Sequence, residues 1–176
     1  MQFNFINNTP KELIFKYIAE HLHSLHLKIN KQDNTRPWGG FFVIEEQDTL
    51  KFINIYFPEL AGLLLKKQTQ LSPKILVVAP QKRLSWQYHP RRAEAWKLIS
   101  GTAAVITSEN DEENHKQYIN VGDITQLKQG ERHRLVGLDD WAIVAEIWLH
   151  TNPNNPSDEN DIVRIQDDFG RQKSPL

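Results

Sequence analysis

The chain of 176 residues is 39% hydrophobic and 24% charged, which is typical of one globular domain with a substantial core. Its formal net charge of −1 argues against a general binder of nucleic acid or anionic membranes. Because it has no cysteine, a disulfide framework, a thiol nucleophile and a thiolate metal site are excluded. The N-terminus lacks the pattern of a secretory signal and no apolar run reaches roughly 20 residues, so a cytoplasmic protein is expected.

The first predicted element is an amphipathic helix. Thr9, Pro10 and Glu12 have the pattern of a helix start, with Thr9 as N-cap and Glu12 completing a capping box. Apolar residues then recur at helical spacing until about residue 27. No two histidines of this helix are four residues apart, so we interpret them as surface residues and not as a metal site: His21, His23 and His26.

The segment between this helix and residue 73 has a mixed pattern. A loop leads to a predicted strand over residues 38–44. Residues 50–57 fit either a strand or a helix, and Asp48-Thr49 as a cap with Pro58 as a stop favours a short helix. Residues 60–72 are expected to form a loop or an irregular helix.

From residue 73 onwards, short strands alternate with turn residues and no helix intervenes. This pattern predicts a mainly β fold, an antiparallel sandwich or barrel. In the last long strand, one face is apolar and the other carries Glu146, Trp148 and His150, which indicates a lined cavity. The predicted strands cover residues 74–79, 83–89, 93–100, 103–108, 116–121, 124–127, 133–136 and 141–150, with a short one at 162–165.

Four residues form a candidate metal site. Gln87 and His89 fall on one face of an extended run, and Glu94 begins a second alternating run. A sheet that folds back could bring His133 over them. Nitrogen and oxygen ligands of this kind suit zinc, manganese or iron. The alternative is a surface histidine beside solvated strand residues, and Arg91 counts against a nearby cation.

Basic residues flank these candidates. Clustered arginines beside a metal pocket would suit a phosphate or carboxylate substrate, whereas the alternative is surface charge paired with acidic neighbours. The five tryptophans fit either sugar stacking or a packed core. The flanking basic residues are Arg91, Arg92, Lys97, Arg132 and Arg134.

Several motifs in order resemble the type II mannose-6-phosphate isomerase family of the cupin superfamily. That cupin also forms the C-terminal domain of bifunctional mannose-1-phosphate guanylyltransferase/isomerases. The resemblance runs from about residue 36 to residue 171. It is carried by Arg36-Pro37-Trp38-Gly39, Pro80-x-x-x-Leu84-Ser85-x-Gln87-x-His89, Arg92-Ala93-Glu94-x-Trp96, Ser100-Gly101-Thr102-Ala103, Gly122-Asp123, Gly130-x-x-His133-Arg134-Leu135, Glu146, Glu159-x-Asp161-Ile162-Val163-Arg164 and Asp167-Asp168-Phe169-Gly170-Arg171.

The resemblance implies a double-stranded β-helix barrel, or jelly roll, with a divalent metal ion inside. The barrel and C-terminal tail would span residues 36–176 and the N-terminal helical extension residues 1–35, folded as one unit. Zinc is favoured, with manganese or iron as alternatives. Pro90 and Arg91 stand where such sequences usually have histidines, and Lys128 and Gly137 where the second motif has Pro and Asn. The implied metal ligands are Gln87, His89, Glu94 and His133.

The function implied is an aldose–ketose isomerase acting on a phosphosugar, mannose 6-phosphate or a heptose phosphate. The alternatives are a non-catalytic cupin that binds a sugar or sugar nucleotide, and an epimerase of nucleotide sugars. A homodimer without nucleic-acid or membrane partners is expected. Glu146, or Glu94 if it is not a ligand, would move the proton, and Lys97 would serve in catalysis or in phosphate binding. The residues predicted to hold the phosphate are Arg36, Arg91 and Arg132.

Overall fold

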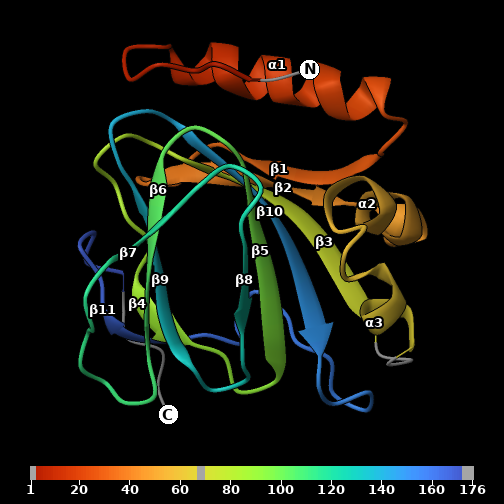
Figure 1. Ribbon diagram of the computed structural model, residues 1–176, viewed down its shortest axis with the longest axis vertical. Coiled ribbons are helices and arrows are strands. Elements are labelled where there is room, and N and C mark those ends of the chain that lie inside the picture. Colours follow the sequence, from red (N-terminus) through yellow and green to blue (C-terminus); the bar gives the residue numbers. More distant parts are fainter. Residues whose placement is uncertain (1–2, 67–69, 172–176) are drawn as a thin grey trace.

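Two antiparallel sheets carry the fold, as the computed structural model in Figure 1 shows. The structure describes residues 3–66 and 70–171, so residues 67–69 of the segment 60–72 and residues 172–176 of the predicted tail lie outside it. The six-stranded sheet has the order β1 (Ile29–Asp33), β2 (Gly39–Ile44), β3 (Leu71–Val78), β10 (Ala142–His150), β5 (Arg92–Ser100) and β8 (Ile124–Leu127). The five-stranded sheet has the order β11 (Val163–Gln166), β4 (Trp86–Tyr88), β9 (Arg132–Gly137), β6 (Ala103–Ser108) and β7 (Gln117–Ile119).

Strand β10 is the central strand of the larger sheet, and all nine of its residues are buried. Its side chains alternate between two hydrophobic cores. Ile143 and Ile147 point into the core shared with the helices, while Val144 points into the interior of the barrel. Glu146 and Trp148 line a cavity in that interior, as the alternation of the sequence predicts.

The helices cover the outer face of the six-stranded sheet. They are α1 (Lys11–Ser24), α2 (Thr49–Tyr56) and α3 (Ala61–Lys66), with a 3-10 turn over Glu46–Asp48. In Figure 1, α1 lies across the top of the barrel and α2 beside β3. The Phe15 ring stacks on Phe42 of β2 at 5.1 Å between centroids, so α1 is part of the main core. No helix of the described ranges is long and apolar enough to cross a membrane.

A glycine makes the tight turn between β5 and β6 possible. Gly101 has φ +82°, and a Cβ there would come within 1.9 Å of the Trp141 carbonyl oxygen. The backbone of the two strands can therefore pass close to Trp141 only at a residue without a side chain.

The mainly β barrel with an N-terminal helix is confirmed. The capping box is wrong: the N-cap is Pro10, no side chain of the described chain caps α1, and the Thr9 N–H donates to the Ile6 carbonyl in the preceding turn. Three other details differ from the sequence-based expectations. Residues 29–33 form an edge strand, residues 61–66 form a regular helix, and only Trp86–Tyr88 of the strand predicted over 83–89 is regular. Arg83 adds one isolated bridge to Val136.

Candidate metal centre and active site

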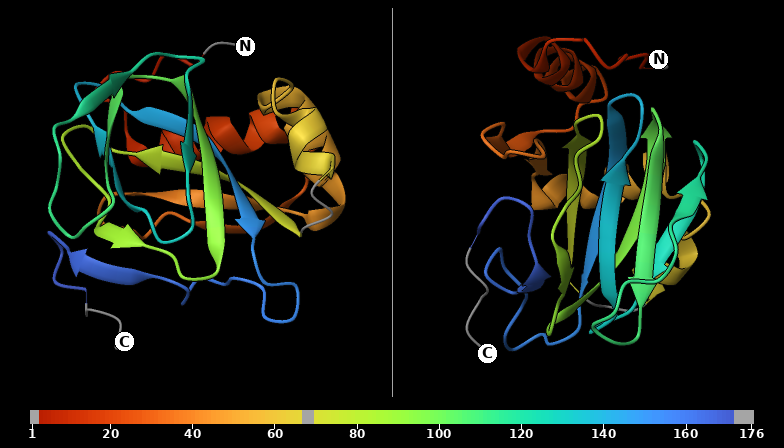
Figure 2. Two further views of the ribbon diagram at one scale, coloured as in Figure 1. Left: turned by 60° about the horizontal axis from the view of Figure 1, so that its bottom comes forward. Right: turned by 90° about the vertical axis from the view of Figure 1, so that its left-hand side faces the viewer.

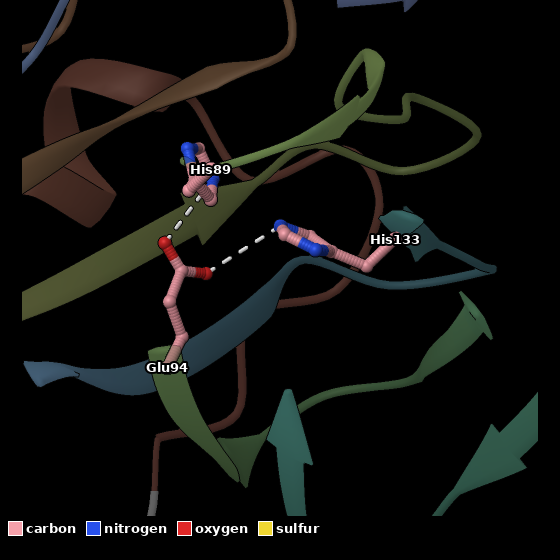
Figure 3. Close-up of side chains that lie close together, drawn as sticks. All are labelled: His89, Glu94 and His133. Atoms are coloured by element: carbon pink, nitrogen blue, oxygen red, sulfur yellow. Dashed lines mark ion pairs between the residues drawn. The ribbon is translucent and has the colours of Figure 1, made fainter. Parts of the chain in front are cut away.

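Three strands bring the predicted ligands into one place. His89 follows β4, Glu94 lies on β5 and His133 on β9, with Gln87 directly opposite His133 in register. Figure 3 shows the Glu94 carboxylate between the two imidazole rings, with one oxygen facing each ring. The distances are 3.2 Å from His89 Nε2 to Glu94 Oε1 and 3.6 Å from His133 Nε2 to Glu94 Oε2. All three side chains are buried.

The hydrogen bonds of the two histidines fix which ring nitrogen carries the proton. His89 Nδ1 lies 2.6 Å from the carbonyl oxygen of Asp161, and His133 Nδ1 lies 2.8 Å from that of Glu131. A carbonyl oxygen only accepts, so each Nδ1 donates. Burial lowers the pKa of both imidazoles, that of His89 well below its usual value, and they are therefore neutral. Each Nε2 consequently presents a lone pair to Glu94.

This arrangement fits a divalent metal ion. Burial opposes the charge of Glu94, but the neighbouring side chains of His89, Arg92 and His133 outweigh it and lower the pKa of the carboxyl; with both imidazoles neutral, it is the Arg92 guanidinium, donating at 2.7 Å, that stabilises the carboxylate. Acceptor atoms thus face acceptor atoms, and within the described residues Glu94 Oε2 and His133 Nε2 have no hydrogen-bond partner. On a tetrahedral zinc with bonds of about 2.0 Å, ligand atoms lie roughly 3.3 Å apart. One ligand atom from each of the three residues lies within 4.8 Å of the others, so the side chains would have to draw together slightly to hold the ion.

Gln87 and Arg92 complete the surroundings of the two histidines. Gln87 turns its amide nitrogen, at 3.4 Å, towards His89 Nε2, while its oxygen accepts from Ser85. It becomes a ligand only when this amide group turns over. The Arg92 guanidinium donates to His89 Nε2 at 3.0 Å and to Glu94 Oε1 at 2.7 Å, so it would release His89 when a metal binds.

The candidate centre opens into a cavity of about 550 Å³ that also contains Glu146. The Trp96 indole donates to Glu146 Oε1 at 2.9 Å. Burial, and then the charge of Glu94, raise the pKa of Glu146 to about 8. Lys74 lies directly opposite Glu146 on β3, is ion-paired with Glu159, and has its ammonium 3.4 Å from the centroid of Trp148. The cavity therefore holds a carboxyl group suited to proton transfer near neutral pH.

Besides Arg92, three further arginines line the same cavity: Arg36, Arg164 and Arg171. Arg36 pairs with Asp33 at 2.8 Å and Arg171 is paired with Asp167. Arg164 Nε is buried and has no hydrogen-bond partner among the residues described. Burial and the charges of Arg171 and Arg36 lower the pKa of Arg164, so the three guanidinium groups lie near one another. Such a cluster can take a bidentate anion.

The structure does not bring the remaining predicted residues to the cavity. Lys97 points to the other side of β5, where its ammonium pairs with Glu59 at 2.8 Å. Arg91 contacts the segment of residues 155–161. Arg132 stacks on Tyr88 and pairs with Asp111 at 2.8 Å. Of the residues predicted to hold phosphate, only Arg36 lines the cavity.

Several cavity residues have no role in the sequence-based predictions. Lys74 shares its strand face with Leu76 and Val78, and a lysine on such an apolar face was a usable signal. Arg164 and Arg171 were part of the resembling motifs, but nothing local distinguishes them from surface arginines. Glu159 is another cavity residue without a predicted role.

Two facing antiparallel sheets with a His-Glu-His group inside define a cupin barrel. Two solved structures show the same fold. A mutant of Bacillus subtilis oxalate decarboxylase OxdC has a TM-score of 0.54 at 15% identity, over 76% of this chain and 30% of that one. The capsular polysaccharide assembling protein CapF from Staphylococcus aureus has a TM-score of 0.51 at 14% identity, over 80% of this chain and 34% of that one.

The chain belongs to the family described as mannose-6-phosphate isomerase C-terminal, whose model matches residues 52–167. The alginate biosynthesis protein AlgA of Pseudomonas putida is 32% identical over 106 residues, covering 58% of this chain and 20% of AlgA. The xanthan biosynthesis protein XanB of Xanthomonas campestris is 34% identical over 101 residues, covering 56% of this chain and 19% of XanB. The match thus covers about a fifth of the length of these relatives.

Proposed function

We propose that this chain is a metal-dependent aldose–ketose isomerase that acts on a phosphorylated sugar, such as mannose 6-phosphate or a heptose phosphate. The observation that carries the proposal is the pair of buried atoms without a hydrogen-bond partner among the described residues, Glu94 Oε2 and His133 Nε2, beside a cavity that Glu94 and Glu146 line. Membership of the isomerase family supports the same reaction class.

His89, Glu94 and His133 would hold the metal ion, with Gln87 as a fourth ligand once its amide turns over. Zinc is our first choice, because two imidazoles and a carboxylate are typical zinc ligands, and manganese or iron fit the same set. When bound, the ion supplies Lewis-acid polarisation of the sugar's carbonyl and hydroxyl oxygens. The hydrogen bonds from Nδ1 of each histidine hold the rings with Nε2 towards Glu94.

Glu146 would carry the proton between the two carbons that exchange oxidation state. The reaction takes a proton from C2 of the aldose and returns one to C1, so one group can do both. A carboxyl group with a pKa of about 8 is suited to both directions near neutral pH. The hydrogen bond from Trp96 orients the carboxyl, and Lys74 opposite it balances the charge that appears when Glu146 ionises.

Arg36, Arg164 and Arg171 would hold the phosphate group. Arg164 is the central residue of this assignment, because its Nε is buried in the cavity wall without a hydrogen-bond partner among the described residues. Guanidinium groups bind phosphate by paired hydrogen bonds, which also fixes the orientation of the sugar.

The test is an isomerisation screen over phosphorylated aldoses and ketoses, with metal analysis of the same protein sample. We expect turnover of at least one phosphosugar and about one divalent ion per chain, with the matching unphosphorylated sugar a much poorer substrate. Arg164→Ala should raise KM for the phosphosugar about tenfold or more while leaving the metal content unchanged. A protein with full metal content that converts no phosphosugar would contradict the proposal.

The second candidate is a non-catalytic cupin that binds a sugar or sugar nucleotide. The favouring observation is Arg92, whose guanidinium already donates to His89 Nε2 and Glu94 Oε1 and so places a cation beside the ligands without a metal. Absence of a stoichiometric metal ion, together with measurable sugar binding, would favour this candidate over the isomerase.

A further inference from the structure

A short C-terminal segment, residues 155–161, lies against His89 and ends at Asp161. The main-chain carbonyl of Asp161 accepts from His89 Nδ1 at 2.6 Å and from Arg92 Nη1 at 3.1 Å. Asp161 is only 4% exposed. Two contacts therefore favour the Nδ1–H tautomer of His89: the Arg92 guanidinium donates to Nε2 at 3.0 Å, and Nδ1 donates to a backbone carbonyl from a segment 72 residues away in the sequence.

Arg91 holds this carbonyl in place through the rest of the segment. The Asp161 carboxylate accepts from the Arg91 main-chain N–H at 3.1 Å and from Arg91 Nε at 3.3 Å, and the Ser157 hydroxyl donates to it at 2.6 Å. At the other end of the segment, Arg91 Nη1 donates to the Asn155 side chain at 2.6 Å and to the Pro156 carbonyl at 3.0 Å. One guanidinium thus contacts both ends of the segment, away from His89.

We propose that Arg91 is a positioning residue for the metal centre. By fixing Asp161, it keeps the Nδ1 proton of His89 directed at the Asp161 carbonyl, so that Nε2 stays unprotonated and can bind a metal ion. The part of this inference that concerns metal affinity rests on the proposed function, whereas the part that concerns the His89 tautomer does not. It also gives Arg91 a role opposite to the one that the sequence indicates. The Arg91 guanidinium lies beside Asp161 and not beside His89, so it stabilises the orientation of the metal ligand His89.

A purely structural role for Arg91 predicts a different result. If Arg91 only fastened the segment, its loss would lower stability without changing the protonation of His89. The tautomer is therefore the deciding quantity, and long-range 1H–15N NMR of the imidazole nitrogens reads it directly in the metal-free protein. The zinc dissociation constant, measured by calorimetry, is the second readout.

We expect wild-type His89 to be the Nδ1–H tautomer and Arg91→Ala to show a mixture of the two tautomers. Zinc should bind Arg91→Ala about tenfold more weakly, the lower end of the effect typical for residues that orient a metal ligand. Asp161→Ala should have at least the same effect, and the double variant should be little worse than Asp161→Ala, because both substitutions remove the ion pair between Arg91 and Asp161. Arg91→Lys keeps the positive charge but not the several N–H donors of a guanidinium. Its tautomer ratio and its zinc affinity should lie between those of Arg91→Ala and wild type.

The matched control is Arg83→Ala. Arg83 also joins the barrel to the C-terminal part of the chain, through bonds of 2.6 and 2.9 Å to Asp168, but no histidine depends on that pair. Arg83→Ala should therefore leave the His89 tautomer and the zinc affinity unchanged.

A wild-type tautomer and wild-type zinc affinity in Arg91→Ala would overturn the inference, even if stability fell. Should Arg91→Ala fail to fold, the same comparison is made on Arg91→Lys. If wild-type protein bound none of zinc, manganese and iron, the proposed function would fail, and the tautomers of the metal-free variants would still decide the role of Arg91.

Discussion

Glu146 is buried in its protonated, uncharged form, so the stability of the folded protein depends on pH. Its pKa of about 8 in the folded protein is higher than the value of 4.5 for a free side chain. Between these values the folded protein keeps a proton that the unfolded chain has released. The free energy of unfolding therefore falls as pH rises through this window. Glu146→Gln cannot ionise, so it should lack this fall and gain on the order of 2–4 kcal/mol relative to wild type between about pH 5 and about pH 8.

Urea denaturation of the metal-free proteins across that window measures the difference. The histidines that titrate in this window do so in both wild type and Glu146→Gln, so their contributions to the free energy of unfolding cancel in the difference. Glu20→Gln, at an exposed glutamate on α1 that pairs with Lys16, should follow the wild-type curve. Parallel curves for wild type and Glu146→Gln would show that Glu146 is ionised in the folded protein.

Individual residues of the candidate site differ in how far the sequence predicts them. Alternation along two extended runs indicates Gln87, His89 and Glu94, because neighbouring residues of a strand share a face at every second position. His133 joins them from the sequence only if the sheet folds back, and the resemblance implies the same residue. The only local signal for Lys74 is its place on an apolar strand face, and its pairing with Glu146 comes from the register of β3 with β10. Asp161 contributes a backbone carbonyl, which no local pattern identifies.

At the scale of elements, α1 is joined to the barrel by its buried face. Phe15 is 2% exposed and stacks on Phe42 of β2. Phe15→Ala should lower the free energy of unfolding by about 3–5 kcal/mol, because it leaves a cavity between helix and sheet. Chemical denaturation measures this loss. Lys16→Ala, at the next and exposed position, should change stability by less than about 0.5 kcal/mol. A similarly small effect of Phe15→Ala would mean that α1 unfolds independently of the barrel.

Elements with a strong period follow from the sequence, and weakly patterned ones do not. The apolar spacing of α1 and the alternation of β10 each predict the element and its buried face. Strand β1, with the sequence INKQD, has mostly exposed side chains and is held by pairing with β2, so only tertiary contacts reveal it. The short helix α3, with the sequence AGLLLK, has no clear helical period, so its sequence predicts a loop or an irregular helix.

At the scale of the whole molecule, the candidate centre joins the two sheets. Glu94 belongs to the six-stranded sheet, whereas Gln87 and His133 belong to the five-stranded sheet. Figure 2 shows these sheets facing each other across the barrel. A metal ion held by both would connect them in the folded state alone, since unfolding separates its ligands.

Zinc should therefore stabilise the whole fold. At a free concentration a hundred times the dissociation constant, the gain is about 2.7 kcal/mol for a site that exists only in the folded protein. Thermal unfolding with and without zinc should show this rise in wild type, and a chelator should reverse it. His133→Ala should lose both the rise and the bound metal, because one of three buried ligands is gone. His115→Ala, at an exposed histidine, should keep the full effect and shows that surface binding does not cause it. An equal rise in His133→Ala would place the stabilising zinc elsewhere and contradict a centre that bridges the two sheets.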